Sequence, residues 1–499
     1  MNYISTRGNN QKISSAEAII KGLASDGGLF VPDEMPKVDL EFVTSLQKLT
    51  YQERAAKVLG KFLTDYTEDE IKGCVERAYG GGKFDTDAIA PVVNLKHPSV
   101  LELWHGPTSA FKDMALQLLP QLLSTALKKT GEKNEVLILV ATSGDTGKAA
   151  LEGFKDVDQI KIIVFYPENG VSRIQYRQMA TQKGNNVCVT AVKGNFDDAQ
   201  SGVKAIFSDV EFNKELNEKG VSLSSANSIN WGRLVPQIVY YFSAYADMIN
   251  SGRITAGEEI TFVVPTGNFG DILAGFYAKE MGLPVKKLVC ASNTNNVLTD
   301  FLNTGVYDRN REFFKTISPS MDILISSNLE RLLYHVTGST EKVAGWMKEL
   351  AEKGRYDVGA EVLAKIQATF GAAWADDDTT MKMIHHGFEC QSYIADTHTA
   401  VAWDAARKLI HGGTPEKVVI VSTASPYKFN ESVLTALGES IEGMDEFQLL
   451  DKLASINTRA GIPAGLASLK TAEILHRWSV RCAGRVQRRR KSKRMMQVC

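Results

Sequence analysis

The stretch Val136-Leu137-Ile138-Leu139-Val140-Ala141 runs directly into Thr142-Ser143-Gly144-Asp145-Thr146-Gly147, and a helical pattern follows from Lys148. Six apolar residues ahead of a turn and a helix are typical of a parallel strand buried on both faces. Small residues in the turn let the backbone approach a ligand, and N–H groups at the helix start attract an anion. Because the turn matches neither the dinucleotide nor the P-loop pattern, the sequence does not predict a nucleotide site. A turn of this kind also serves plain packing in many proteins.

The same alternation of short apolar runs with helical patterns continues along most of the chain. The runs are Val136–Ala141, Ile160–Tyr166, Val187–Ala191, Ile260–Val264, Leu288–Ala291 and Val418–Ser422. This alternation predicts an α/β fold with buried parallel strands. In such folds ligands bind beyond the carboxyl ends of the strands, so the residues after each run are candidate site residues.

Three further segments stand out by position or polarity. Pro265-Thr266-Gly267-Asn268-Phe269-Gly270-Asp271 follows a run and precedes a helical pattern, and it is a second candidate anion site. The segment 224–233 is polar but leads into an apolar helical pattern, and Ser422-Thr423-Ala424-Ser425-Pro426 is a hydroxyl-rich strand end. Together with the turn at 142–147 they give two anion sites and a set of hydroxyl groups.

A lysine completes this set. His105-Gly106-Pro107-Thr108-Ser109-Ala110-Phe111-Lys112-Asp113 places Lys112 after a Gly-Pro turn, at the start of an apolar helical pattern. Poor solvation at such a position lowers the pKa of a lysine and makes its amine a possible nucleophile. A lone lysine of this kind is more often an ordinary solvated residue. A reactive amine beside two anion sites meets the requirements of a pyridoxal phosphate enzyme.

The composition indicates a globular protein of two or three domains. Hydrophobic residues make up 44% and charged residues 23% of the 499 residues. No apolar run is long enough for a membrane span, and residues 1–8 lack the apolar core of a signal peptide, so we expect a cytoplasmic protein with no membrane contact. The six cysteines show no metal-like spacing, which predicts reduced thiols and no metal site.

The net charge of −1 hides two parts of opposite charge. From Arg477 onward the chain has nine basic residues and no acidic one, whereas the remainder has 48 basic and 58 acidic residues. Such a tail could bind nucleic acid. Because no aromatic residues are interleaved with the charges as a stacking surface needs, we favour a tail without an evolved role and expect no nucleic-acid partner.

Five segments, in order along the chain, resemble the threonine synthase family of fold type II pyridoxal phosphate enzymes. They are HGPTSAFKDMALQ, ATSGDTG, ANSINWGRLVPQ, PTGNFGDI and IADTHTAVA, and the N-terminal YISTRG and SDGGLFVP resemble the longer branch of that family. The resemblance covers residues 1–476 and implies a fold of two α/β domains with a mostly helical N-terminal domain. The implied parts are an N-terminal domain at 1–92, a large cofactor-binding domain at 93–130 and 215–476, a small mobile domain at 131–214, and a disordered basic tail at 477–499.

The resemblance implies a role for each candidate residue. Lys112 would carry pyridoxal 5'-phosphate as a Schiff base and act as the catalytic base. The loop that would wrap the cofactor phosphate is Gly267, Asn268, Phe269, Gly270 and Asp271. Thr423 would hydrogen-bond the pyridine nitrogen. The substrate carboxylate would bind at Thr142, Ser143, Gly144, Asp145 and Thr146, and the substrate phosphate at Asn227, Ser228 and Arg233, where a guanidinium suits bidentate binding.

The implied reaction converts O-phospho-L-homoserine and water to L-threonine and phosphate, in a lyase that is a monomer or homodimer. An alternative is a phospho-lyase that releases 2-oxobutyrate and ammonia from the same substrate, because the same residues would serve both reactions. A third hypothesis is a non-enzymatic protein that binds through its basic tail, which the intact lysine and both anion sites argue against.

Two histidines lie near these segments. His398 follows Thr397, and we favour helix capping by Thr397 over a role of His398 in the chemistry. His105 precedes the Gly-Pro turn, and we expect it to be structural.

Overall fold

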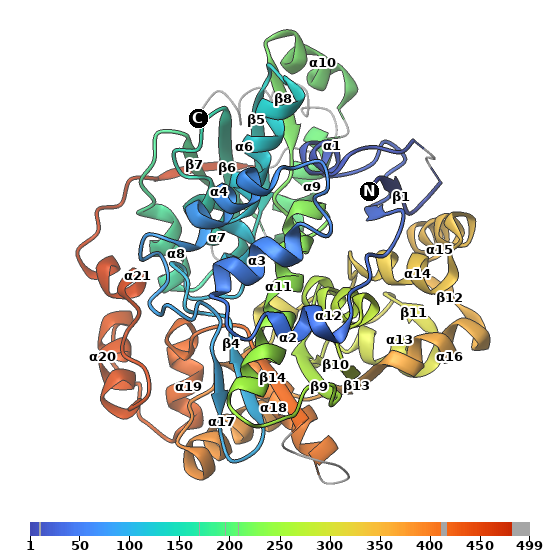
Figure 1. The fold of residues 1–499 in the computed structure, drawn as a ribbon. Helices are drawn as coiled ribbons and strands as arrows, with labels where there is room; N and C mark the ends of the chain where they lie inside the picture. The colour runs from blue at the N-terminus through green and yellow to red at the C-terminus, as the bar shows by residue number, and fades with distance from the viewer. Residues whose placement is uncertain (9–10, 169, 195, 208, 411–416, 482–499) are drawn as a thin grey trace.

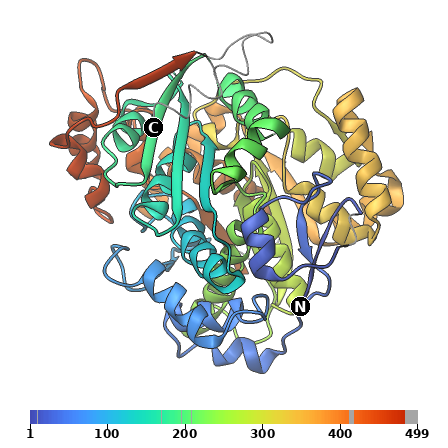
Figure 2. The ribbon, with the colours of Figure 1, turned by 90° about the horizontal axis from the view of Figure 1, so that it is seen from above.

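Two separate sheets organise the molecule (Figures 1 and 2). The computed structural model describes residues 1–8, 11–168, 170–194, 196–207, 209–410 and 417–481. All six apolar runs predicted as strands lie in these sheets, and every pair that they form with one another is parallel. The predicted α/β fold is therefore confirmed.

The larger sheet has six strands in the order β13-β10-β9-β14-β4-β3. Their bounds are β3 Val92–Asn94, β4 Ser99–Glu102, β9 Ile260–Pro265, β10 Val285–Ser292, β13 Phe370–Trp374 and β14 Val418–Ser422. Only the edge pair β3–β4 is antiparallel. The sequence did not predict β3, β4 or β13, because these strands are short or rich in glycine and alanine and give a weak apolar signal.

The second sheet has five parallel strands in the order β15-β7-β6-β5-β8. Their bounds are β5 Glu135–Ala141, β6 Ile160–Pro167, β7 Val187–Lys193, β8 Val221–Ser224 and β15 Trp478–Arg481. β8 lies within the range predicted for the large domain, and β15 lies at the start of the predicted disordered tail, yet both pair into this sheet. Residues 482–499 of the predicted tail lie outside the described residues. The domain ranges themselves stay a prediction.

The N-terminal region is mostly helical and adds a two-stranded sheet. Its helices are α1 Ser15–Lys21, α2 Leu40–Ser45, α3 Tyr51–Leu59 and α4 Glu68–Tyr79, and its strands are β1 Tyr3–Ser5 and β2 Phe30–Pro32. Ser14, Thr50 and Thr67 start three of these helices with capping boxes, in which a glutamate three residues on bonds back to the cap. These pairs explain why the helices begin where they do.

Helices pack around the sheets and between them. They are α5 Lys112–Leu116, α6 Leu119–Thr130, α7 Asp145–Phe154, α8 Arg173–Ala180, α9 Phe196–Phe207, α10 Val210–Glu218, α11 Trp231–Asn250, α12 Gly270–Met281, α13 Val297–Thr304, α14 Leu329–Thr337, α15 Thr340–Lys353, α16 Gly359–Thr369, α17 Asp377–Gln391, α18 Thr397–Ile410, α19 Asn430–Ala436, α20 Glu446–Ile456 and α21 Ala464–Ala467. A second hairpin, β11 Val306–Asp308 with β12 Arg355–Asp357, joins the α13–α16 region.

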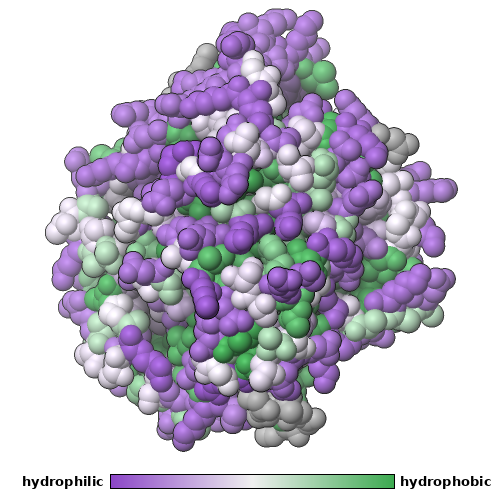
Figure 3. Space-filling model, in the orientation of Figure 1, coloured by the Kyte–Doolittle hydropathy of each residue, from purple (hydrophilic) through white to green (hydrophobic). Residues whose placement is uncertain are grey.

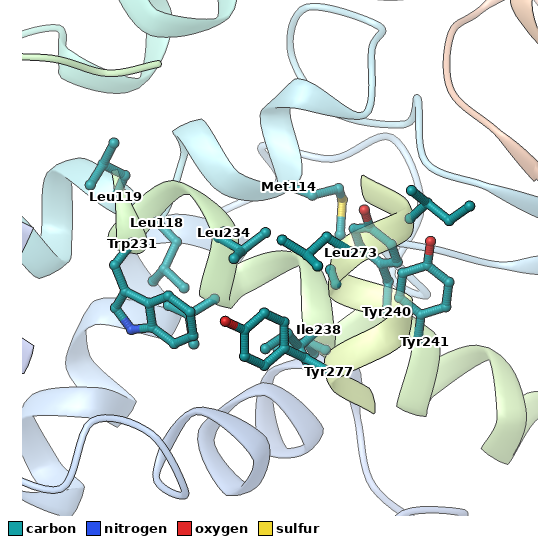
Figure 4. Close-up of a cluster of buried hydrophobic side chains, with 14 of the residues drawn as sticks. Met114, Leu118, Leu119, Trp231, Leu234, Ile238, Tyr240, Tyr241, Leu273 and Tyr277 are labelled. Carbon is teal, nitrogen blue, oxygen red and sulfur yellow. The ribbon is translucent and has the colours of Figure 1, made fainter. Parts of the chain in front are cut away.

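Helix α11 lies in the centre of the molecule and is buried along nearly its whole length (Figure 1). Its apolar side chains pack against α5, α6 and α12, as Figure 4 shows for Trp231, Leu234 and Ile238 around Tyr277. A helix that is apolar on all sides must be enclosed by other elements. Helix α11 thereby joins the N-terminal helices to the elements that carry the site.

The face of the molecule seen in Figure 3 bears few large apolar areas. Hydrophilic residues cover most of the face shown in Figure 3, with hydrophobic residues in small separate areas. Within the described residues, none of the helices combines the length and apolarity that crossing a membrane requires. Cys74, Cys290 and Cys390 are free thiols, but Cys188 is disulfide-bonded, which corrects the expectation that every cysteine is reduced.

Truncation of a core leucine of α11 tests this packing. Leu234→Ala should lower the free energy of unfolding by about 2–5 kcal/mol, because Leu234 is fully buried and the change leaves a cavity. The matched variant Leu40→Ala, at a side chain that is 42% exposed, should change it by less than about 0.5 kcal/mol. Urea unfolding curves of the two variants measure the difference, and equal effects would contradict the central position of α11.

Candidate active site

The predicted site segments all follow carboxyl ends of strands. The lysine segment follows β4, the turn at 142–147 follows β5, the segment with Asn227, Ser228 and Arg233 follows β8, the loop at 266–269 follows β9, and Thr423 follows β14. Three of these strands belong to the larger sheet and two to the second sheet. Residues far apart in sequence are thereby brought together between the two sheets.

The turn before Lys112 is fixed by its own side chains. The Asp113 carboxylate accepts hydrogen bonds from the Thr108 backbone N–H at 2.8 Å and from the Thr108 hydroxyl at 2.7 Å. A Cβ at Gly106 would lie 2.5 Å from the Cβ of Asp113, so glycine is required there. The backbone N–H of Phe111 donates to the carbonyl of Thr423 at 2.8 Å. This last bond ties the lysine segment to the end of β14.

The amine of Lys112 is buried and has no close carboxylate partner among the described residues. Its Nζ lies 3.3 Å from Oγ of Ser320 and 3.8 Å from Oδ2 of Asp145. Burial lowers the pKa of Lys112 to about 8, although the Asp145 carboxylate acts in the opposite direction. This is the direction that the sequence predicts. A substantial share of the amine is therefore neutral near physiological pH, as a base or nucleophile requires.

The carboxylate of Asp145 stands between two lysines. Lys428 Nζ lies 2.6 Å from Oδ1, Lys112 lies near Oδ2, and the side-chain amide of Gln175 donates to Oδ1 at 3.1 Å. Burial alone would raise the pKa of Asp145, but the ammonium groups of Lys428 and Lys112 outweigh burial and hold that pKa well below its usual range. Asp145 is therefore ionised.

The turn at 142–147 is held by a hydroxyl. Oγ1 of Thr142 accepts hydrogen bonds from the backbone N–H groups of Gly144 and Gly147, both at 2.9 Å. Gly144 has φ +138°, and a Cβ there would lie 2.4 Å from the Gln175 amide carbon, so only glycine fits. The hydroxyl of Thr142 thus shapes the loop. The backbone N–H groups of Gly144 and Gly147, which belong to the predicted anion site, already donate to this hydroxyl.

The loop after β9 leads into a helix start that can hold an anion. Phe269 has the left-handed φ of +62° at the N-cap of α12, and the carbonyl of Asn268 accepts hydrogen bonds from the backbone and side-chain N–H groups of Asn328, both at 3.1 Å. A Cβ at Gly267 would lie 2.7 Å from the carbonyl oxygen of Ser320. The N–H groups of the first turn of a helix have no acceptor within the helix, so α12 offers them to a phosphate.

Asp271 takes a structural position within this helix start. Its Oδ1 accepts hydrogen bonds from the hydroxyls of Tyr240 at 2.6 Å and Tyr241 at 2.8 Å. Burial raises the pKa of Asp271 to about 6. The side chain therefore faces α11, which leaves only the backbone of Asp271 for the predicted contact with a phosphate.

Arg233 is a buried cation that forms no ion pair with a described residue. Its Nη1 donates to the carbonyl of Ala226 at 3.0 Å, and its Nε has no acceptor among the described atoms. Burial lowers the pKa of Arg233 to about 10, which still leaves it charged. A buried guanidinium without a counter-ion is costly. Its chemistry fits a phosphate, which suits the predicted role.

The other residues predicted to bind the cofactor or the substrate lie within these same segments. Ser228 lies beside Gly270, since a Cβ built on Gly270 would be 3.5 Å from the Cβ of Ser228. Thr423 is buried, Thr146 and Asn227 are half-buried, and Ser143 is exposed. Their contacts with a ligand stay predictions.

A histidine supports the segment opposite Lys112. The backbone N–H of Ser320 donates to Nε2 of His398 at 3.1 Å, so the ring proton lies on Nδ1 and is donated to Asp396 at 2.8 Å. Asp396 also accepts from the backbone N–H groups of His398 and Thr399, and it, rather than the predicted Thr397, caps α18. His105 contacts Asp85 and Glu102, consistent with the structural role expected.

Sequence reasoning missed Lys428, Ser320 and Asp396. Lys428 comes three residues after Ser425 at a strand end, and its place beyond β14 is a signal that could have identified it. Ser320 and Asp396 lie outside the apolar runs, and their sequence gave no comparable signal.

Models of known families match three parts of the chain. A model described as threonine synthase N terminus matches residues 2–79, one described as pyridoxal-phosphate dependent enzyme matches residues 100–373, and one described as threonine synthase, C-terminal, matches residues 399–471. The second alone covers more than half of the chain. The three matches follow one another in order and include Lys112, the turn at 142–147, the loop at 267–271 and Thr423, whereas Asp396 and His398 fall between the second and third matches.

Individual proteins are similar over most of the chain. Threonine synthase of Pseudomonas aeruginosa is 42% identical over 436 residues, which cover 87% of this chain and 90% of that protein. Threonine synthase-like 1 of Homo sapiens is 42% identical over 442 residues, and the aligned part spans only 59% of its length. The crystal structure of pyridoxal-phosphate-bound threonine synthase from Brucella melitensis superimposes with a TM-score of 0.86 at 36% identity and covers 98% of both chains.

Proposed function

Because the chain belongs to the threonine synthase family of fold type II pyridoxal-phosphate-dependent enzymes, we propose that it converts O-phospho-L-homoserine and water to L-threonine and phosphate. The observation that carries this proposal is the buried Lys112 amine, which contacts Ser320 beside Gly267 of the loop before α12 and has the buried Arg233 as an electrostatic neighbour. A monomeric or dimeric state and a cytoplasmic location stay predictions.

The residues present fit the cofactor. Lys112 has a pKa of about 8, which leaves an amine able to bond an aldehyde. The loop 267–271 brings unbonded N–H groups of a helix start to one place, and only glycine fits at position 267. In the proposal this loop holds the cofactor phosphate, Lys112 bonds the cofactor, and the hydroxyl of Thr423 contacts the pyridine nitrogen.

Pyridoxal phosphate, when bound, supplies an electron sink that stabilises negative charge on carbons next to the substrate nitrogen. Once the substrate amine has replaced it on the cofactor, the freed amine of Lys112 acts as the general base that removes the proton from Cα and then moves protons at neighbouring carbons. Phosphate leaves from Cγ, and water adds at Cβ to give the hydroxyl of threonine.

The substrate is held at both ends in this proposal. Arg233 and Ser228 bind its phosphate, because the buried guanidinium has no counter-ion among the described residues. The N–H groups of Ser143 and Thr146 bind its carboxylate, while Thr142 and Gly144 fix the loop. We further propose that segment 131–214 moves toward the larger sheet and excludes water.

The assay that tests the function supplies the purified protein with pyridoxal phosphate and O-phospho-L-homoserine. Threonine and phosphate should form in equal amounts, and Lys112→Ala should abolish both, because the base and cofactor anchor are lost. The exposed variant Lys72→Ala should retain full activity. Phosphate accompanied by 2-oxobutyrate and ammonia would instead show the phospho-lyase reaction, which the comparisons do not favour.

Removal of the Arg233 guanidinium tests phosphate recognition. Arg233→Met should raise KM for O-phospho-L-homoserine by roughly 10–100-fold, since a hydrogen bond to a charged group contributes about 1.5–3 kcal/mol. Arg355→Met, at an exposed arginine of β12, serves as the control. Steady-state kinetics and thermal unfolding should be compared, and an unchanged KM in a folded Arg233→Met protein would exclude this role.

A further inference from the structure

Lys428 is a second buried lysine of the site, with no role assigned so far. It lies in the turn Pro426–Phe429 after β14, and its side chain is completely buried. Its Nζ lies 2.6 Å from Oδ1 of Asp145 and donates to the carbonyl of Thr108 at 3.0 Å. The ammonium group of Lys428, at the end of β14, therefore contacts both the turn after β5 and the segment that carries Lys112.

The two lysines share one carboxylate unequally. Lys428 has the short contact with Asp145, whereas Lys112 lies 3.8 Å from the other oxygen. Gln175 adds a second donor on the oxygen that Lys428 contacts. The carboxylate is therefore largely satisfied without Lys112, and its charge is balanced by Lys428.

We propose that Lys428 is a positioning residue for Lys112: by pairing with Asp145, it prevents a tight ion pair between Asp145 and Lys112 and leaves the Lys112 amine free to react. This inference rests on the proposed function only in taking Lys112 as the reacting amine. A protonated lysine in a close ion pair has no lone pair to offer, so the function of Lys112 requires that another cation bind the carboxylate.

The charges around Lys112 support this assignment. Burial is the main cause of its lowered pKa, Asp145 raises that pKa, and Lys428 and Arg233 lower it. Asp113 raises it as well, but its carboxylate is held by Thr108. Removal of Lys428 would take away one lowering charge and leave the raising charge of Asp145 unbalanced. The protonated form of Lys112 would then be favoured.

Titration of Lys112 in the full chain tests the proposal without any measurement of activity. The protein is freed of bound aldehyde with hydroxylamine, its lysines are methylated with ¹³C-formaldehyde under reducing conditions, and NMR follows the signals against pH. The signal of Lys112 is identified by its absence in Lys112→Arg. In the protein without any substitution, Lys112 should titrate near pH 8.

Lys428→Met should move this titration upward by about 1–3 pH units, the effect of an unbalanced opposite charge at this range. Lys72→Met removes a lysine that pairs with Glu68 at the same distance of 2.6 Å on an exposed helix, and it should leave Lys112 unchanged. Lys428→Met combined with Asp145→Asn removes both charges, and its Lys112 should titrate close to pH 8 again.

The double variant also keeps the test decisive if Lys428→Met alone does not fold, because no buried carboxylate is left unpaired in it. In that case a Lys112 titration shifted upward by more than about one pH unit in the double variant would overturn the proposal. An unchanged or lowered titration in a folded Lys428→Met protein would overturn it directly. Failure of the proposed function would appear separately, as a lack of threonine formation in a protein whose Lys112 titrates as expected.

Discussion

The buried carboxylate of Asp145, held between Lys428 and Lys112, is the interaction on which the arrangement of the site depends. Transfer of charges out of water is costly and is offset only where each charge is paired and hydrogen-bonded. Here the carboxylate comes from the second sheet and both lysines come from segments of the larger sheet. The same ion cluster therefore holds the two sheets at the site and sets the charge around the reacting amine.

The two proposed anion sites differ in their physical basis. The start of α12 would bind through backbone N–H groups and the helix dipole, and such a site needs close approach, which Gly267 allows. Arg233 would bind through a fixed side-chain charge that has no counter-ion among the described residues. In the proposed function the first site holds the phosphate of the cofactor and the second holds the phosphate of the substrate.

The sequence predicted the fold and the main site segments because both depend on local patterns. Apolar runs such as Val136–Ala141 give a strong strand signal, and the glycines and the lysine that follow strand ends identify the ligand-facing edge. The weak edge strands β8 and β15 were missed because Val221, Ser222 and Leu223 are only half-buried and Trp478 and Ser479 are exposed, so both strands lack that signal. A strand at a sheet edge is specified largely by its neighbour.

Contacts between residues that lie far apart in the sequence could not be predicted in the same way. Lys428 and Asp145 are 283 positions apart in the sequence, and nothing in either segment indicates the contact. Asp271 was placed in the predicted phosphate loop without any expectation for its carboxylate, which the folded chain directs to Tyr240 and Tyr241 of α11. Side-chain direction at a helix start depends on the packing partner, which a single sequence does not show.

A crystal structure of the protein with pyridoxal phosphate and a phosphonate analogue of O-phosphohomoserine tests the central claim most directly. The account predicts the cofactor phosphate at the N–H groups of residues 267–271, with the amine of the analogue in place of Lys112 on the cofactor and the freed Lys112 amine beside it, and the phosphonate at Arg233, with Lys428 still paired to Asp145. A cofactor phosphate bound instead at the turn 142–147, or Lys112 in a close ion pair with Asp145, would contradict it.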